Sequence, residues 1–190
     1  QPAGFRNQLI NGDLNIWQRN WTGTATNEII YPSADRWSVG DGTTFQRDVN
    51  VPVGAGFTWS GSLDQSTTFK QGIEINSQAP ENNVFFDGSQ WTLSIYATAQ
   101  PSAYNASFQD DVRGANQQVT ATGTFSPIGS TDANGFTRYA ATFTVNGTAI
   151  SSNRCFAINI ASGGALSFTG VQLEPGPIAT PFEHRPIGTE

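Results

Sequence analysis

The fold is decided by the stretch Trp91-Thr92-Leu93-Ser94-Ile95-Tyr96-Ala97-Thr98. Its larger apolar side chains alternate with Thr92 and Ser94. Successive side chains of a β-strand point to opposite faces, so the alternation predicts a strand with one face in a core and the other wet or covered. The stretches from Tyr139 to Val145 and from Phe156 to Ile160 alternate in the same way and predict two further strands.

Short runs of this kind recur along the chain and are bounded by Gly, Asn, Asp, Pro or Ser. Asx-Gly pairs at 11–12, 41–42, 87–88, 134–135 and 146–147 favour turns that need positive φ. The run from Leu9 to Gln18 is a weaker strand candidate. Near Gly170 the core parity changes, which indicates a β-bulge. The sequence therefore predicts an all-β fold, a two-sheet antiparallel β-sandwich of the jelly-roll type.

The chain shows no linker, charge run or internal repeat, which favours a single domain. We expect residues 1–174 to form the jelly-roll sandwich and residues 175–190 to form an extended tail of the same domain. The stretch from Glu174 to Pro186 carries four prolines. Because proline cannot donate to a sheet ladder or continue a helix, this Pro-rich tail is expected to lie on the sandwich or on a neighbouring chain.

Charge and composition exclude several classes of partner. Nine Lys and Arg residues stand against 15 Asp and Glu, for a net charge of −6, and Lys70 is the only lysine. Neutralising phosphates requires clustered cations, so nucleic acid is excluded as a partner. No apolar run reaches the roughly 20 residues that span a bilayer, so we expect no membrane insertion.

Residue chemistry favours a protein that is not an enzyme. His184 is the only histidine, which leaves little for Ser-His-Asp or metal-His chemistry, and Cys155 lies in an apolar pattern typical of a packed thiol. Asp110 and Asp111 are adjacent on a predicted strand and would point to opposite faces. We therefore predict no catalytic residues, no cofactor and no metal ligand, although a structural Ca²⁺ tying loops together stays open.

The aromatic residues are the best candidates for a binding site. A sugar ring stacks on Trp or Tyr while Asn, Gln, Asp and Arg hydrogen-bond its hydroxyls. Trp17, Trp37 and Trp91 lie within apolar patterns and are expected in the core. Four others stand in polar, turn-adjacent or loop surroundings or have the outward parity of their strand. The predicted ligand-binding residues are Trp21, Trp59, Tyr96 and Tyr104.

Both ends of the chain resemble a family of bacteriophage tail-fibre and related virion proteins with carbohydrate-binding-module-like jelly-roll domains. The segment from Asn7 to Arg19 resembles the family's opening strand, and Ala34-Asp35-Arg36-Trp37 resembles the short motif after it. The segment from Phe168 to Pro186 resembles the closing strand and tail. The resemblance implies a jelly roll in an extracellular virion and brings no catalytic residues with it.

Two hypotheses follow. In the first, the chain is a non-enzymatic tail-fibre receptor-binding domain that recognises a host-surface glycan, contacts other virion subunits and assembles as a homo-oligomer, a trimer by analogy with tail fibres. In the alternative, it is a structural virion subunit, a capsid decoration or fibre-connecting protein, that makes only protein contacts. Binding to glycans distinguishes the two, because only the first requires it.

Overall fold

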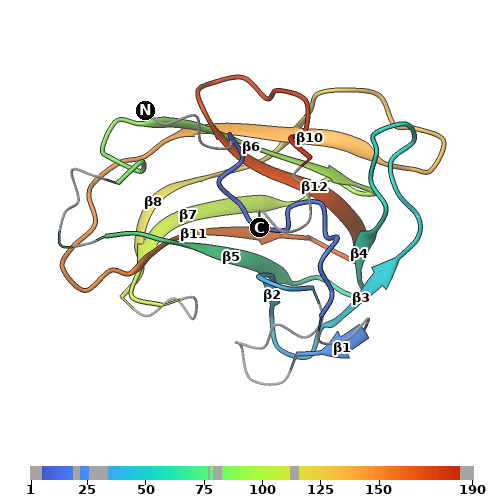
Figure 1. The fold of residues 1–190 in the computed structure, drawn as a ribbon, viewed down its shortest axis with the longest axis horizontal. Helices are drawn as coiled ribbons and strands as arrows, with labels where there is room; N and C mark the ends of the chain where they lie inside the picture. Colours follow the sequence, from blue (N-terminus) through green and yellow to red (C-terminus); the bar gives the residue numbers. More distant parts are fainter. Residues whose placement is uncertain are drawn as a thin grey trace.

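Two antiparallel sheets stack face to face in a computed structural model, which describes residues 6–18, 22–25, 34–76, 78, 83–111 and 116–184 (Figure 1). The larger sheet has the order β1 (Thr22–Thr24), β3 (Thr44–Asp48), β4 (Ser60–Leu63), β12 (Leu166–Pro175), β6 (Gln90–Ala97), β10 (Thr137–Thr144) and β9 (Ser126–Pro127). The smaller sheet has the order β2 (Ser38–Val39), β5 (Thr68–Glu74), β11 (Cys155–Ala161), β7 (Ala103–Gln109) and β8 (Gln118–Gly123). The predicted all-β, two-sheet antiparallel sandwich is confirmed. The described residues contain no helix of the length and apolarity that a bilayer crossing requires.

The three strands predicted from alternation, β6, β10 and β11, all lie in the interior of a sheet with a neighbouring strand on each side. β6 lies between β12 and β10, with Leu93 opposite Ala141 and Ile95 opposite Tyr139. β11 lies between β5 and β7. The inward side chains of these strands form one core, because each strand buries the apolar half of its alternation.

Aromatic rings hold the two sheets together. The Phe69 and Phe168 rings stack with centroids 4.2 Å apart across the sandwich, and those of Phe85 and Phe156 stack at 4.0 Å. The three tryptophans predicted in the core are buried there, with exposed fractions of 8% for Trp17, 0% for Trp37 and 3% for Trp91. Aromatic pairs of this kind add packing energy beyond the area that they bury.

The predicted bulge lies in β12. The register between β12 and β6 shifts between Thr169 and Gln172, and Gly170 has a φ of +59°. A Cβ at Gly170 would lie 2.5 Å from Phe57 Cζ and 2.9 Å from Tyr96 Cδ2. Glycine is needed there both for the backbone conformation and for the close approach of two rings.

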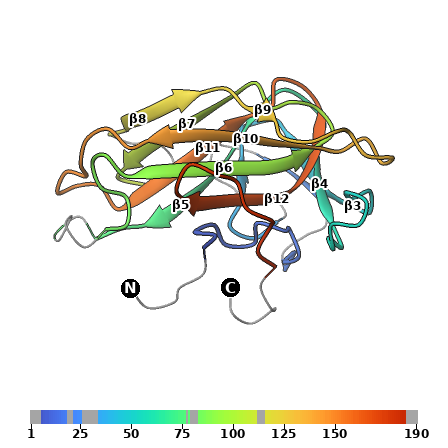
Figure 2. The same cartoon turned by 90° about the horizontal axis from the view of Figure 1, so that it is seen from above.

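The run from Leu9 to Gln18 is not a strand, which corrects the sequence-based prediction. Asn11 has a positive φ, and its side-chain amide binds the backbone of Ile16, at 3.0 Å to the carbonyl and 2.9 Å from the N–H. An asparagine that satisfies local backbone groups in this way competes with strand pairing. The segment lies along the second half of β12, where Gln8 N–H donates to the Leu173 carbonyl at 2.8 Å (Figure 2).

After β12 the chain turns back over the outer face of the larger sheet (Figure 1). We call residues 176–184 the strap. Thr92 Oγ1 donates to the Gly176 carbonyl at 2.7 Å, and Thr142 Oγ1 donates to the Pro177 carbonyl at 3.2 Å. Thr92 and Ser94 are 1% and 0% exposed although they point away from the core. The described part of the Pro-rich tail therefore lies on its own sandwich, and residues 185–190 lie outside the described residues.

Candidate functional site

Two of the predicted binding residues lie on the larger sheet, on either side of Thr169. Trp59 immediately precedes β4, is half-buried, and carries the Arg47 guanidinium 3.9 Å above its ring centroid. The Thr169 hydroxyl donates to the Trp59 carbonyl at 3.0 Å, and Thr169 is the cross-strand partner of Tyr96. Tyr96 is half-buried under Phe57, whose ring centroid is 5.4 Å away.

The other two predicted residues do not join them. Tyr104 lies in β7 rather than in a loop, and only 6% of its surface is exposed. Because β7 begins at Ala103, the Tyr104 side chain falls on the core side and packs against Phe125 and Phe143, with centroids 5.8 and 5.4 Å away. Burial also raises the pKa of its phenol. The expectation that Tyr104 offers its ring from a surface loop is therefore corrected, while Trp21 lies outside the described residues.

A different set of side chains gathers on the outer face of the smaller sheet. In β7 the residues that alternate with the core-facing Tyr104, Ala106 and Phe108 point outward, and β11 contributes the outward residue beside them. One more residue immediately precedes β8. We call the five residues Asn105, Ser107, Gln109, Gln117 and Asn159 the amide face.

Hydrogen bonds connect most of the amide face. Gln109 Nε2 donates to Ser107 Oγ at 2.7 Å. Gln117 Nε2 donates to the same hydroxyl at 3.0 Å and to Asn105 Oδ1 at 3.1 Å. Two buried atoms, Gln109 Oε1 and Asn159 Nδ2, have no hydrogen-bond partner in the described part of the chain. A buried acceptor or donor without a hydrogen-bond partner lowers the free energy of unfolding, and a ligand that bonds to it would remove this cost.

The amide face consists of residue types that do not stand out in the sequence. The sequence signal for this face is the polar half of the alternation in strands whose apolar half lies in the core. Asn159, for example, lies between the core residues Ile158 and Ile160. Nothing in the sequence shows that β7 and β11 are neighbours. Only their pairing places Asn105 opposite Asn159.

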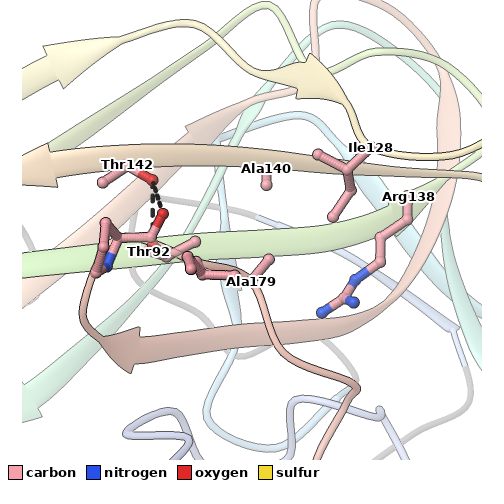
Figure 3. Close-up of a pocket in the computed structure, with 8 residues that line it drawn as sticks. Thr92, Ile128, Arg138, Ala140, Thr142 and Ala179 are labelled. Carbon is pink, nitrogen blue, oxygen red and sulfur yellow. Dashed lines mark hydrogen bonds between the residues drawn. The ribbon is translucent and has the colours of Figure 1, made fainter.

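The structure also contains a hollow beside the strap, with a volume of about 480 Å³. It lies over β10 between β9 and the strap, and we call it the strap groove (Figure 3). Figure 3 shows Arg138 and Ile128 at one end, Thr92 and Thr142 at the other, and Ala140 between them. The lining residues are Thr92, Ile128, Arg138, Ala140, Thr142, Pro177, Ile178 and Ala179.

The residues considered for catalysis or metal binding have other roles. Cys155 is buried, and burial, followed by the nearby Asp111 and Asp110, raises the pKa of its thiol to about 11. Asp110, just beyond the end of β7, accepts hydrogen bonds from Asn116 and Asn153, which lower its pKa. Within the described ranges, no group of three or more His, Cys, Asp or Glu side chains is placed to hold a metal ion. The structural Ca²⁺ remains a prediction without assigned ligands.

Comparisons with known proteins leave the family open. No protein-family model matches the chain. No curated protein matches it either.

Solved structures resemble it only distantly. A cyclase from Fischerella sp. TAU is 12% identical, with 77% of this chain and 87% of that chain covered and a TM-score of 0.47. The CBM22-1 xylan-binding domain from Paenibacillus barcinonensis Xyn10C is 9% identical, with 75% and 87% covered and a TM-score of 0.44. A carbohydrate-binding module of Cellvibrio mixtus lichenase 5A in complex with cellotriose is 14% identical, with 70% and 88% covered and a TM-score of 0.36. Values this low assign neither a ligand nor a reaction to this chain, whose fold rests on its own strand pairings.

Proposed function

We propose that this chain is a non-catalytic module that binds a glycan on the amide face. The observation that supports the proposal is a set of uncharged amides and one hydroxyl on a single sheet face, two of whose buried polar atoms lack a partner among the described residues. Sugar hydroxyls both donate and accept hydrogen bonds. One hydroxyl can therefore donate to Gln109 Oε1 while another accepts from Asn159 Nδ2.

The accessible part of the face carries no charged side chain. Ala157, the cross-strand partner of Ser107, and Gly72 beyond it have small side chains or none. Because Ala157 is only 1% exposed, a ligand would reach the face over the half-buried Asn105 and Asn159 and the exposed Gln117. Amides orient a ligand through directional bonds without requiring that it carry charge. Glycan specificity would then come from the match between hydroxyl positions and the amides.

For the biological setting, we propose that the module belongs to a bacteriophage tail fibre and recognises a host-surface glycan. Support comes from the resemblance of residues 7–19 and 168–186 to that family. Display on a trimeric fibre alongside other virion subunits would raise the avidity of a weak sugar site, because the second and third contacts become intramolecular. The alternative, a structural virion subunit, expects the Pro-rich tail to act as an arm on a neighbour, whereas residues 176–184 lie on their own sheet.

The test is binding of the purified chain to an array of neutral glycans, followed by titration of the best ligand against variants. Gln109→Met removes the unpaired oxygen and also the Nε2 bond to Ser107, while keeping the length of the side chain. We expect this variant to weaken binding at least tenfold and to change the free energy of unfolding by no more than about 1 kcal/mol, because the loss of one buried hydrogen bond is offset by the loss of a buried unsatisfied acceptor. Asn159→Ala should weaken binding to a similar extent.

Matched variants on the other sheet make the result specific. Gln46→Met changes an exposed amide of β3 and should leave binding unchanged. Trp59→Ala tests the aromatic prediction separately, since Trp59 is not part of the amide face. Light scattering establishes whether the chain is a trimer. A folded chain that binds no glycan, or one whose binding survives both amide-face variants, would contradict the proposal, and the first of these results would favour the structural virion subunit.

A further inference from the structure

Arg138 is an unusual cation in this structure. It lies on β10 at one end of the strap groove, half-buried, with its Cζ 5.4 Å from the Tyr96 ring centroid. Nη2 donates to Ser94 Oγ at 3.0 Å and to the Thr180 carbonyl. Nε is buried and has no partner among the described residues, and no described carboxylate lies within 4.0 Å of the guanidinium. A half-buried guanidinium without an anionic partner is a favourable place for a carboxylate.

The carboxylate of Glu174, which holds the strap through Thr180, does not fill this role. Glu174 is 2% exposed, and its carboxylate accepts hydrogen bonds from Thr180 N–H at 2.9 Å and Thr180 Oγ1 at 2.6 Å. Glu174 and Arg138 therefore both bind Thr180, one through its N–H and hydroxyl and the other through its carbonyl. Arg138 is therefore the one charged residue among the eight that line the groove.

The opposite end of the groove offers hydrogen-bond acceptors. Thr92 Oγ1 uses its single proton on the Gly176 carbonyl at 2.7 Å. The hydroxyl of the exposed Thr142 lies 3.1 Å from Thr92 Oγ1 and donates to the Pro177 carbonyl at 3.2 Å. Because Thr92 has no proton left to give, both lone pairs of Thr142 Oγ1 remain open to a ligand's hydroxyl.

These two ends specify what kind of molecule spans the groove. Arg138 and Thr142 are four residues apart on one strand, which is about 13 Å at the antiparallel rise. Between them lie the small Ala140 and the apolar side chains of Ile128 and Ile178, which are 47% and 72% exposed. The occupant needs a carboxylate at one end, hydroxyl donors at the other and a C–H surface between them. A fatty acid lacks the hydroxyls and would need an enclosed apolar volume.

We propose that the strap groove is a second binding site, for a short acidic oligosaccharide whose carboxylate pairs with Arg138. The site goes beyond the amide face, which lies on the other sheet and takes neutral hydroxyls. It is built in part by the chain's own strap, because Pro177, Ile178 and Ala179 form one wall of it.

The test uses a disaccharide of glucuronic acid and N-acetylglucosamine, and the same disaccharide as its methyl ester, in NMR titrations of the full chain. The ester keeps every hydroxyl and removes the charge. We expect the acid to bind at least tenfold more tightly than the ester, since a charge-assisted pair with Arg138 is lost. Arg138→Gln should abolish this difference between the two ligands.

Replacing Arg138 could also release the strap, so further variants change the groove and keep Arg138. Ile178→Asp puts a carboxylate at a highly exposed position on the rim and should weaken binding of the acid at least tenfold. Ile150→Asp makes the same change at an exposed isoleucine outside the groove and should have no effect. Ala140→Leu narrows the floor and should weaken both ligands equally.

The outcomes separate this proposal from the preceding one. Equal binding of acid and ester, no binding of either, or acid binding that survives Ile178→Asp in a folded chain would each overturn the strap-groove site. Acid binding that disappears with Gln109→Met and persists with Ile178→Asp would place the ligand on the amide face and overturn it as well. Loss of neutral-glycan binding alone would count against the amide face and leave this site standing.

Discussion

Strands of both sheets alternate between apolar and polar side chains, yet the outer faces of the two sheets differ. On the larger sheet, the chain's own strap covers Thr92 and Ser94, which are less exposed than some core residues. On the smaller sheet, outward residues of β7 bond to one another and to Gln117, while Gln109 Oε1 and Asn159 Nδ2 have no hydrogen-bond partner among the described residues. Polar residues that point outward from a strand therefore do not by themselves form a solvent-exposed surface. What the rest of the chain places over them decides their role.

The largest expected effect comes from releasing the strap. Glu174→Ala removes a carboxylate that accepts a buried bond from Gln172 Nε2 at 2.8 Å and two part-buried bonds from Thr180. We expect a loss of about 4 kcal/mol in the free energy of unfolding, because charge-assisted bonds disappear and buried donors are left unpaired. Urea denaturation measures it. Glu74→Ala, at an exposed position of β5, is the control and should cost under about 0.5 kcal/mol. A similar small cost at Glu174 would show that the strap is not held as described.

The bulge beneath the strap should be the next most sensitive point. Gly170→Ala adds a Cβ that meets Phe57 and Tyr96 at a positive φ, and we expect a loss of about 3 kcal/mol. Gly88→Ala is matched for backbone strain, with a φ of +82° and no atom within 4 Å of the new Cβ, and should cost about 1 kcal/mol. Thermal unfolding of both variants separates the steric part from the strain. Equal losses would mean that the rings move aside freely.

Asp13 tests the N-terminal segment that borders the strap. Burial raises the pKa of this carboxyl above its ordinary value of 3.8, and Oδ1 has no partner in the described residues. The protonated form is thus favoured by folding, so the stability that it contributes is present below pH 3.8 and is lost as the pH rises through the raised pKa. Asp13→Asn should therefore stabilise the chain by about 1 kcal/mol at pH 7 and by nothing near pH 3. Unfolding curves across this pH range would contradict the assignment if the difference were constant.

The smallest effect concerns the smaller sheet, where Cys155 lies 6% exposed in β11. With a pKa of about 11 instead of 9.0, its thiolate fraction at pH 8 is about a hundredfold lower than that of an unperturbed thiol. Reaction with a thiol reagent should therefore be slow in the native chain, at least a hundredfold slower than in urea. Rapid native labelling would show that this face opens more than the structure indicates, and would sharpen the contrast with the strapped sheet.

How well the sequence predicts a feature depends on how far apart in the chain the residues that determine the feature lie. Alternation located β6, β10 and β11, and the change of parity located the bulge at Gly170, because these signals are local. The prediction of a strand from Leu9 to Gln18 is wrong because the Asn11 side chain bonds to the backbone carbonyl and N–H of Ile16. A pattern of apolar residues gives no sign of such a bond. The sequence predicts Tyr104 within a loop over residues 101–105, whereas β7 begins at Ala103 and includes it.

Side-chain periodicity is a local property, and it predicts the all-β class and the core-facing residues of β6, β10 and β11 from the sequence. The chemistry of proline likewise predicts a C-terminal segment that is neither a helix nor a central strand. Tertiary structure alone decided that Asn105 lies opposite Asn159, and that the strap folds onto its own sheet and gives Arg138 a groove to face. These are contacts between residues far apart in the chain. Which outward side chains meet depends on strand order and register, and no local pattern carries that information.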